Sequence, residues 1–108
     1  MIIGFLRGLL LSGLSIASVA VAAPTGPYLP SPAQRLAASC ANCHGVDGRS
    51  QHRQIPSLAG KSAAELTRKL LAFRQGTAQS TVMGQIAKAY SEDELRTLAD
   101  YFSQQPRR

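Results

Sequence analysis

Cys40-Ala41-Asn42-Cys43-His44-Gly45 is the stretch of this 108-residue chain around which the rest is organised. Its Cys-x-x-Cys-His run places two thiols and an imidazole within about one turn of chain. Thiols at this spacing can add across the two vinyl groups of one porphyrin, and the adjacent imidazole then lies beneath the iron as its proximal ligand. This run is the attachment motif of a c-type haem. The sequence therefore predicts one covalent haem c, tethered by Cys40 and Cys43 and ligated by His44.

Three other uses of paired cysteines are alternatives to haem attachment. A zinc site needs a second Cys or His pair at ligand spacing, whereas His52 stands alone eight residues after His44. A thioredoxin-like redox pair needs a preceding strand and a βαβ context, whereas the surroundings here are alanine-rich and helical. A purely structural disulfide is the third alternative. We expect haem attachment in preference to all three.

The N-terminal segment has the pattern of a secretory signal peptide. Arg7 is its single charge, Gly8 to Ala23 is uncharged, and Ala20-Val21-Ala22 offers small residues for cleavage. We expect cleavage near Ala22 and a periplasmic mature protein, which suits a cofactor attached outside the cytoplasmic membrane. The alternative is an uncleaved membrane anchor, but the uncharged run is short of the ~20 residues that a span needs and is interrupted by Gly13 and serines.

The chain divides into a signal peptide at 1–22, a proline-rich extended lead-in at 23–30, and a single domain at 31–108. A mature protein of this size buries only a small core by itself. A covalently held haem supplies an apolar centre, so we expect the apoprotein to fold poorly.

The mature chain is basic. Its formal charge is +5, one less than the +6 of the whole sequence, because Arg7 lies in the signal. The basic residues are spread singly and do not line one helix with interleaved aromatic residues, which argues against nucleic acid as a partner. Positive charge spread around a redox site favours an acidic protein partner, with an association that weakens as salt rises.

The sequence pattern of this domain predicts an all-α fold of three to four short helices around one haem. Ser31-Pro32 reads as an N-cap followed by Pro at the first helical position, which begins a short helix that delivers the haem motif. The segment from Gly45 to Gly60 lacks helical periodicity and is expected to be a loop. Within it, the carbonyl of Pro56 is placed to accept the Nδ1 hydrogen of His44, although Pro56 alternatively only stiffens the loop.

Capping and periodicity patterns in the second half of the domain predict the remaining helices. Ser62-Ala63-Ala64-Glu65 reads as a capping box that begins a helix over 63–75, ended by Gly76. A short helical piece follows at 84–89, and Ser91-Glu92-Asp93-Glu94 is a second capping box. The last helix has an apolar face that we expect to cross the Leu36 and Ala37 face of the first helix. That face comprises Leu95, Leu98, Ala99 and Phe102.

Met83 is the candidate for the sixth iron ligand. It is the only methionine left once Met1 is removed with the signal. A thioether in this position favours reduced iron and raises the reduction potential. Three alternatives are that Met83 is core filler, that His52 is the distal ligand, and that the iron is five-coordinate and open to small molecules.

On these residues the chain resembles class I cytochromes c, with a helix into CANCHG, a proline-containing loop, a distal Met and a C-terminal helix. The segments IPSLAG (55–60) and STVMGQIAKAYS (80–91) are similar to those of the haem subunit of flavocytochrome c sulfide dehydrogenase. The resemblance covers Ala33 to Gln104 and implies Cys40 and Cys43 as thioether positions and His44 and Met83 as iron ligands. The chain departs from this family in one respect: many such subunits carry two haem domains in tandem, and this chain has one haem motif.

The resemblance implies an electron-transfer protein without bond-making chemistry of its own. The leading hypothesis is a periplasmic monohaem subunit that accepts electrons from a flavoprotein oxidising sulfide and passes them to a downstream carrier. The alternative is a free soluble cytochrome c that shuttles between respiratory or photosynthetic complexes. A third hypothesis is a haem sensor or ligand-binding enzyme with an open distal side.

Overall fold

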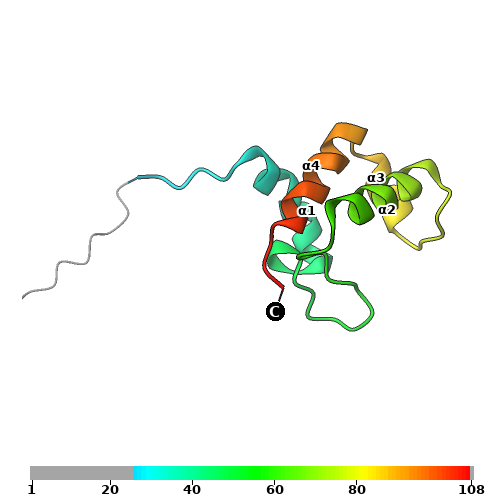
Figure 1. Ribbon diagram of the computed structural model, residues 1–108, viewed down its shortest axis with the longest axis horizontal. Helices are drawn as coiled ribbons and strands as arrows, with labels where there is room; N and C mark the ends of the chain where they lie inside the picture. The colour runs from blue at the N-terminus through cyan, green and yellow to red at the C-terminus, as the bar shows by residue number, and fades with distance from the viewer. Residues whose placement is uncertain (1–25, 108) are drawn as a thin grey trace, which may run out of the picture.

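The computed structural model describes residues 26–107, which form four α-helices and one 3₁₀ turn. These are α1 (Pro32–His44), η1 (Val46–Gly48), α2 (Ala63–Gln75), α3 (Met83–Lys88) and α4 (Glu92–Ser103). The described range contains no strand, which confirms the all-α prediction (Figure 1). No helix within this range is long and apolar enough to cross a bilayer. The predicted signal peptide and its cleavage site lie outside the described residues.

Serine caps begin α1 and α4 as the sequence predicts. The Ser31 side chain accepts a hydrogen bond from the Gln34 backbone N–H at 3.2 Å, and the Gln34 side chain accepts from the Ser31 N–H at 2.7 Å. The same reciprocal pair joins Ser91 and Glu94, at 3.2 and 2.8 Å. Each pair satisfies two of the N–H groups that a helix start leaves free. Both helices are therefore fixed at their N-terminal ends by local sequence.

The predicted capping box of α2 is only half formed. The Ser62 hydroxyl accepts from the Glu65 N–H at 3.1 Å, but the Glu65 carboxylate lies 3.3 Å from Lys69 Nζ and 3.7 Å from Lys61 Nζ. These lysines, Lys69 first, lower the pKa of Glu65. The prediction of a full capping box is therefore wrong for α2, because two flanking cations compete with the Ser62 N–H for the Glu65 carboxylate.

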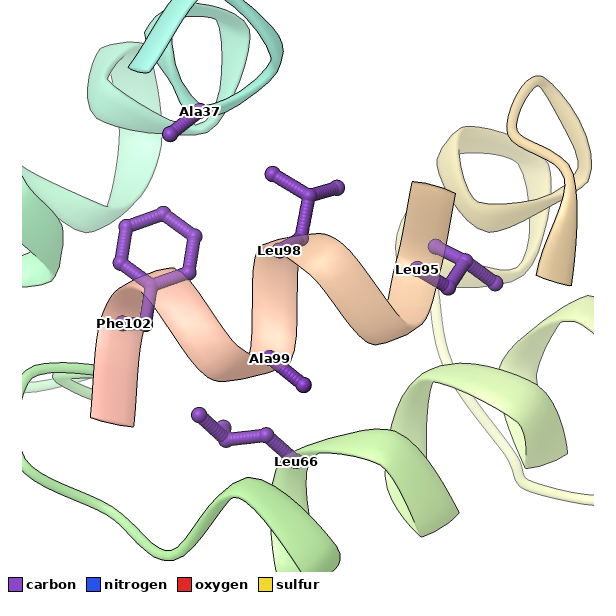
Figure 2. Packing of buried hydrophobic residues seen from close by; sticks show 6 residues of the cluster. All are labelled: Ala37, Leu66, Leu95, Leu98, Ala99 and Phe102. Carbon is purple, nitrogen blue, oxygen red and sulfur yellow. The ribbon is translucent and has the colours of Figure 1, made fainter. Parts of the chain in front are cut away.

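The core lies where α4 crosses α1 and α2 (Figure 2). Ala37 of α1 faces Leu98 and Phe102 of α4, while Leu66 of α2 lies beside Ala99. The predicted crossing of the first and last helices is therefore confirmed. Ala37 and Ala99 are small, and each is at least 95% buried, so the helices approach closely at these positions.

The loop after η1 is tied to both η1 and α4. The Gly48 carbonyl accepts hydrogen bonds from Leu58 N–H at 2.7 Å and Ala59 N–H at 3.2 Å, and Gly60 N–H donates to the Phe102 carbonyl at 2.9 Å. A long loop is thus closed at its base by three backbone bonds. Figure 1 shows this loop and the one between α2 and α3 extending away from the crossing of α1 and α4.

Gly48→Ala is expected to destabilise the protein much more than Gly76→Ala. Both glycines have a φ near +75°, so both substitutions incur the ~1–2 kcal/mol cost of a left-handed residue with a Cβ. An added Cβ at Gly48 meets Phe102 Cδ1 at 2.8 Å and Leu58 Cβ at 2.9 Å, whereas at Gly76 nothing lies within 4 Å. We expect Gly48→Ala to lower the free energy of unfolding by about 2 kcal/mol more than Gly76→Ala does, since overpacking costs ~1–3 kcal/mol. Denaturant unfolding of the two variants measures this difference, and equal losses would contradict the packing described here.

Candidate haem-attachment site

His44, the last residue of α1, is held in one orientation. Its side chain is buried, with 7% exposure for the residue, and Nδ1 lies 2.7 Å from the Pro56 carbonyl oxygen. A carbonyl only accepts, so Nδ1 is the nitrogen that carries the hydrogen. Nε2 is then the nitrogen with a lone pair for a metal. The predicted contact between Pro56 and His44 is confirmed.

Cys40 and Cys43 lie three residues apart in α1, so their side chains share one side of the helix. Neither is in a disulfide; Cys40 is half-buried and Cys43 is exposed. Burial raises the pKa of the Cys40 thiol, which keeps it protonated at neutral pH. The two sulfur atoms and the His44 ring are thus presented together by the last turns of one helix.

The structure gives no support to the other uses of the cysteine pair. Across residues 26–107 no group of three or more Cys, His, Asp or Glu side chains is placed to hold a metal ion. The same range lacks the strand that a thioredoxin-like context requires.

Gly45 allows the chain to turn directly after His44. Its φ is +79°, and an added Cβ would lie 2.0 Å from the carbonyl oxygen of Arg49. That atom is backbone and cannot rotate away, so only glycine fits here. Gly45 N–H donates to the Ala41 carbonyl at 3.0 Å, which ends α1 at the histidine.

Met83 is the first residue of α3 and is half-buried. The predicted helix at 84–89 therefore begins one residue earlier and contains the candidate ligand. The Gly84 N–H donates to Ser80 Oγ at 2.7 Å, a side-chain bond that fixes the start of this short helix. Val82 and Ile86 beside it are exposed at 59% and 38%. The role of Met83 as an iron ligand stays a prediction.

His52 lies in the exposed part of the loop between η1 and α2. Its backbone N–H donates to the Ser50 hydroxyl, which in turn donates to the His52 carbonyl, both at 3.1 Å. This local turn holds the backbone at the surface. The geometry supports the interpretation of His52 as a surface residue.

The protein core is thin for a domain of this length, which fits a large apolar cofactor. Within residues 26–107, four of the eight buried apolar residues are alanines, and the largest fully buried side chains are Leu95 and Leu98. Several larger apolar side chains are only half-buried: Leu36, Leu58, Leu70, Leu71, Phe73 and Met83. Because the hydrophobic effect disfavours so much exposed apolar surface, these side chains suit contact with a porphyrin.

A polar network that the sequence analysis missed supports the turn next to His44. The Tyr101 hydroxyl donates to Asp47 Oδ1 at 2.8 Å, and Asp47 Oδ2 accepts from Arg49 Nη2 at 2.8 Å. Asp47 adopts a positive φ of 55°, so these contacts stabilise an unfavourable backbone conformation. The Asp47-Gly48 turn signal was visible in the sequence, but a contact between residues 54 positions apart was not.

Asp47→Asn is expected to lower the pKa of Tyr101. Burial first, and then the hydrogen bond and charge of Asp47, raise this pKa from 10.0 to about 12. The pKa of Tyr101 is higher in the folded than in the unfolded protein. Protonated Tyr101 therefore contributes fully to the free energy of unfolding below pH ~10, and this contribution is lost as pH rises through 12. Ultraviolet titration of the phenolate measures the shift. Asp93→Asn, the same change at an exposed position on α4, is the control, and an equal response of both variants would contradict the network.

A family model described as cytochrome c matches residues 31–106. The chain belongs to the cytochrome c family. It carries one covalent haem c, which the spacing of Cys40 and Cys43 accommodates, and it is an electron-transfer protein without a catalytic reaction of its own.

Two curated relatives of this cytochrome have names that mention sulfur compounds. It is 42% identical, over 96 residues, to the cytochrome subunit of sulfide dehydrogenase from Chlorobaculum tepidum; the match covers 87% of this chain and 86% of the relative. It is 41% identical to the thiosulfate dehydrogenase electron acceptor of Stutzerimonas stutzeri, over 65% of this chain and 34% of that relative.

A solved structure supports the fold of this cytochrome. Acidithiobacillus ferrooxidans cytochrome c4 matches with a TM-score of 0.58 and 35% identity, over 60% of this chain and 37% of that one. The expected class I cytochrome c fold is therefore confirmed. The cytochrome c4 chain is much longer than the matched part, whereas little of the C. tepidum subunit lies outside its match.

Proposed function

We propose that this cytochrome is a periplasmic, monohaem electron-transfer subunit that accepts electrons from a flavoprotein oxidising sulfide and passes them to a downstream carrier. The observation that carries the proposal is the 42% identity to a sulfide dehydrogenase cytochrome subunit, because it extends over 87% of this chain and 86% of that protein. The similarity to the thiosulfate dehydrogenase electron acceptor of Stutzerimonas stutzeri adds support for a donor that oxidises reduced sulfur.

Four residues of the chain hold the cofactor in this proposal. Cys40 and Cys43 would form the thioethers, and His44 Nε2 and Met83 would ligate the iron. The Pro56 carbonyl keeps His44 in the tautomer that ligation needs and raises its basicity. When bound, haem c supplies reversible one-electron chemistry, which suits acceptance of electrons singly from a flavin.

The surface next to these residues suits a protein partner. Val46 beside His44 is 72% exposed, and Val82 and Ile86 flank Met83 at 59% and 38%. Exposed apolar side chains next to the proposed haem residues could supply the apolar contacts found at the centre of protein interfaces. The positive charge of the chain favours a partner with an acidic docking surface.

The proposal includes the organisation of the precursor. Residues 1–22 direct export and are removed near Ala22, residues 23–30 form the lead-in, and residues 31–108 form the haem domain. The family-model match over residues 31–106 supports placing the haem domain in this part of the chain.

Native purification combined with a reduction assay tests the proposed function. We expect the holoprotein to co-elute with a flavoprotein, and its haem to be reduced when sulfide is added to the pair but slowly with sulfide alone. The reduction rate should fall as salt rises, because the surface charges are then screened. A cytochrome that elutes alone and is not reduced by the sulfide-fed flavoprotein contradicts the proposal. Elution alone with rapid reduction supports the free shuttle instead.

A further inference from the structure

A basic cavity lies at the base of the loop between η1 and α2. Its volume is about 670 Å³. Three cationic side chains from separate parts of the chain line it: Arg49, which follows η1; Lys61, which precedes α2; and Arg107, near the C-terminus. Glu65 is the one acidic residue that lines it within the described part of the chain. The cations therefore converge from three directions on one hollow.

Each of these cations has hydrogen-bonding capacity beyond its contacts within the chain. Arg107 uses Nε to donate to the Gly60 carbonyl at 2.8 Å, and its two Nη groups make no bond to other described residues. Lys61 Nζ lies 3.7 Å from Glu65, beyond hydrogen-bond distance. Arg49 pairs with Asp47 through Nη2, and among the described residues Nη1 makes only a long contact of 3.5 Å, to the Pro106 carbonyl.

The wall of the cavity also offers one free hydroxyl hydrogen, that of Ser57, since the Ser50 hydroxyl donates to the His52 carbonyl. Ser50 and Ser57 line it, and the Ser57 oxygen already accepts from the Ser50 N–H at 3.0 Å. The Ser57 hydroxyl hydrogen is therefore available as a donor. Guanidinium, ammonium and hydroxyl donors together match the oxygen atoms of phosphate and carboxylate groups.

The cavity is separate from the haem-attachment site. Ser57 and Ala59 line it, whereas Leu58 between them packs against the hydrophobic core. Cys40, Cys43 and His44 are not among its lining residues. It nevertheless adjoins the support of the proximal ligand, because Ser57 directly follows the residue whose carbonyl accepts from His44.

We propose that this cavity binds a small polyvalent anion, of the diphosphate or polycarboxylate class, at a site distinct from the haem. Its volume exceeds that of a single phosphate group, and three converging cations suit a ligand with more than one anionic centre. A negative charge held beside the loop that supports His44 favours the more positive, oxidised haem. By linkage, the oxidised protein binds the anion more tightly than the reduced protein.

Calorimetric titration of the holoprotein with pyrophosphate, in low-salt buffer without phosphate, tests this proposal. We expect saturable binding with one anion per chain, tighter for the oxidised than for the reduced protein. The double variant Lys61→Gln, Arg107→Gln should bind at least about tenfold more weakly, because it removes two charge-assisted hydrogen-bond donors. Arg96→Gln is the matched control, since Arg96 is an exposed cation on α4 outside the cavity, and it should change the affinity less than about twofold.

Ser57→Ala provides a second variant that keeps every charge and removes one hydroxyl donor. We expect a loss of affinity of about three- to tenfold, with a slightly lower thermal midpoint because the variant also removes the acceptor of the Ser50 N–H. The absence of saturable binding overturns the proposal. So does a double variant that loses no more than twice the binding free energy lost by Arg96→Gln, because the loss per charge is then the same and net charge alone attracts the anion. Equal affinity in the two redox states overturns the linkage to the haem.

Discussion

The double variant Cys40→Ser, Cys43→Ser is expected to lose both the covalent haem and the stable fold. Serine hydroxyls do not form the thioether bonds, so the cofactor is no longer tethered. The protein core is alanine-rich, with Leu95 and Leu98 as its largest fully buried side chains. Small domains have only ~5–15 kcal/mol of stability, and losing the apolar contacts to the porphyrin removes most of this. Thermal unfolding followed by far-ultraviolet circular dichroism should show no cooperative transition.

Single variants separate attachment from folding in this experiment. Cys43→Ser leaves one thioether through Cys40, so haem is retained and the protein stays folded with a lower thermal midpoint. Ser39→Ala, a neighbouring substitution that leaves both thiols in place, is the control and should keep the full haem content. A colourless double variant that unfolds cooperatively near the wild-type midpoint contradicts the idea that haem completes the core.

Met83→Ala is expected to lower the reduction potential and to abolish the weak methionine-to-iron absorption band. A thioether ligand favours the reduced iron, and its removal leaves water or another oxygen donor at the sixth position. We expect a fall on the order of 100 mV or more, within the ~0.8 V range that axial ligands span. Potentiometric titration and optical spectra of the purified variant measure both effects.

His52→Ala is the matched control for ligation, because His52 is the other candidate for the distal position. It is exposed and lies in a loop turn held by Ser50, so its replacement should leave the potential and the spectrum unchanged. A spectrum that responds to His52→Ala and not to Met83→Ala contradicts the assignment. An unchanged spectrum in both variants indicates an open distal side.

Local signals in the sequence predicted most of the fold. Ser31-Pro32 and Ser91 to Glu94 mark helix starts, since a cap depends on residues within one turn of each other. The apolar spacing of the last helix predicted its crossing with α1 for a similar reason, because periodicity identifies the buried face. The Pro56 contact to His44 was predictable as well, since Pro56 lies in the loop that follows the motif.

Contacts between distant segments were beyond what the sequence could predict. The bond from Tyr101 to Asp47, the tight fit around Gly48 and the meeting of Arg49, Lys61 and Arg107 all join parts of the chain that no local pattern relates. The prediction of a full capping box at Ser62 failed for another reason: two lysines near Glu65 compete for its carboxylate. Local motifs thus predicted the attachment site, while its supporting network and the basic cavity required the folded chain.

The mass of the exported wild-type protein tests the central claim most directly. We predict a chain that begins near Ala23 and carries the mass of one haem, with the added mass on the peptide that contains both Cys40 and Cys43. A well-folded, colourless protein whose mass equals that of the polypeptide alone would contradict the account.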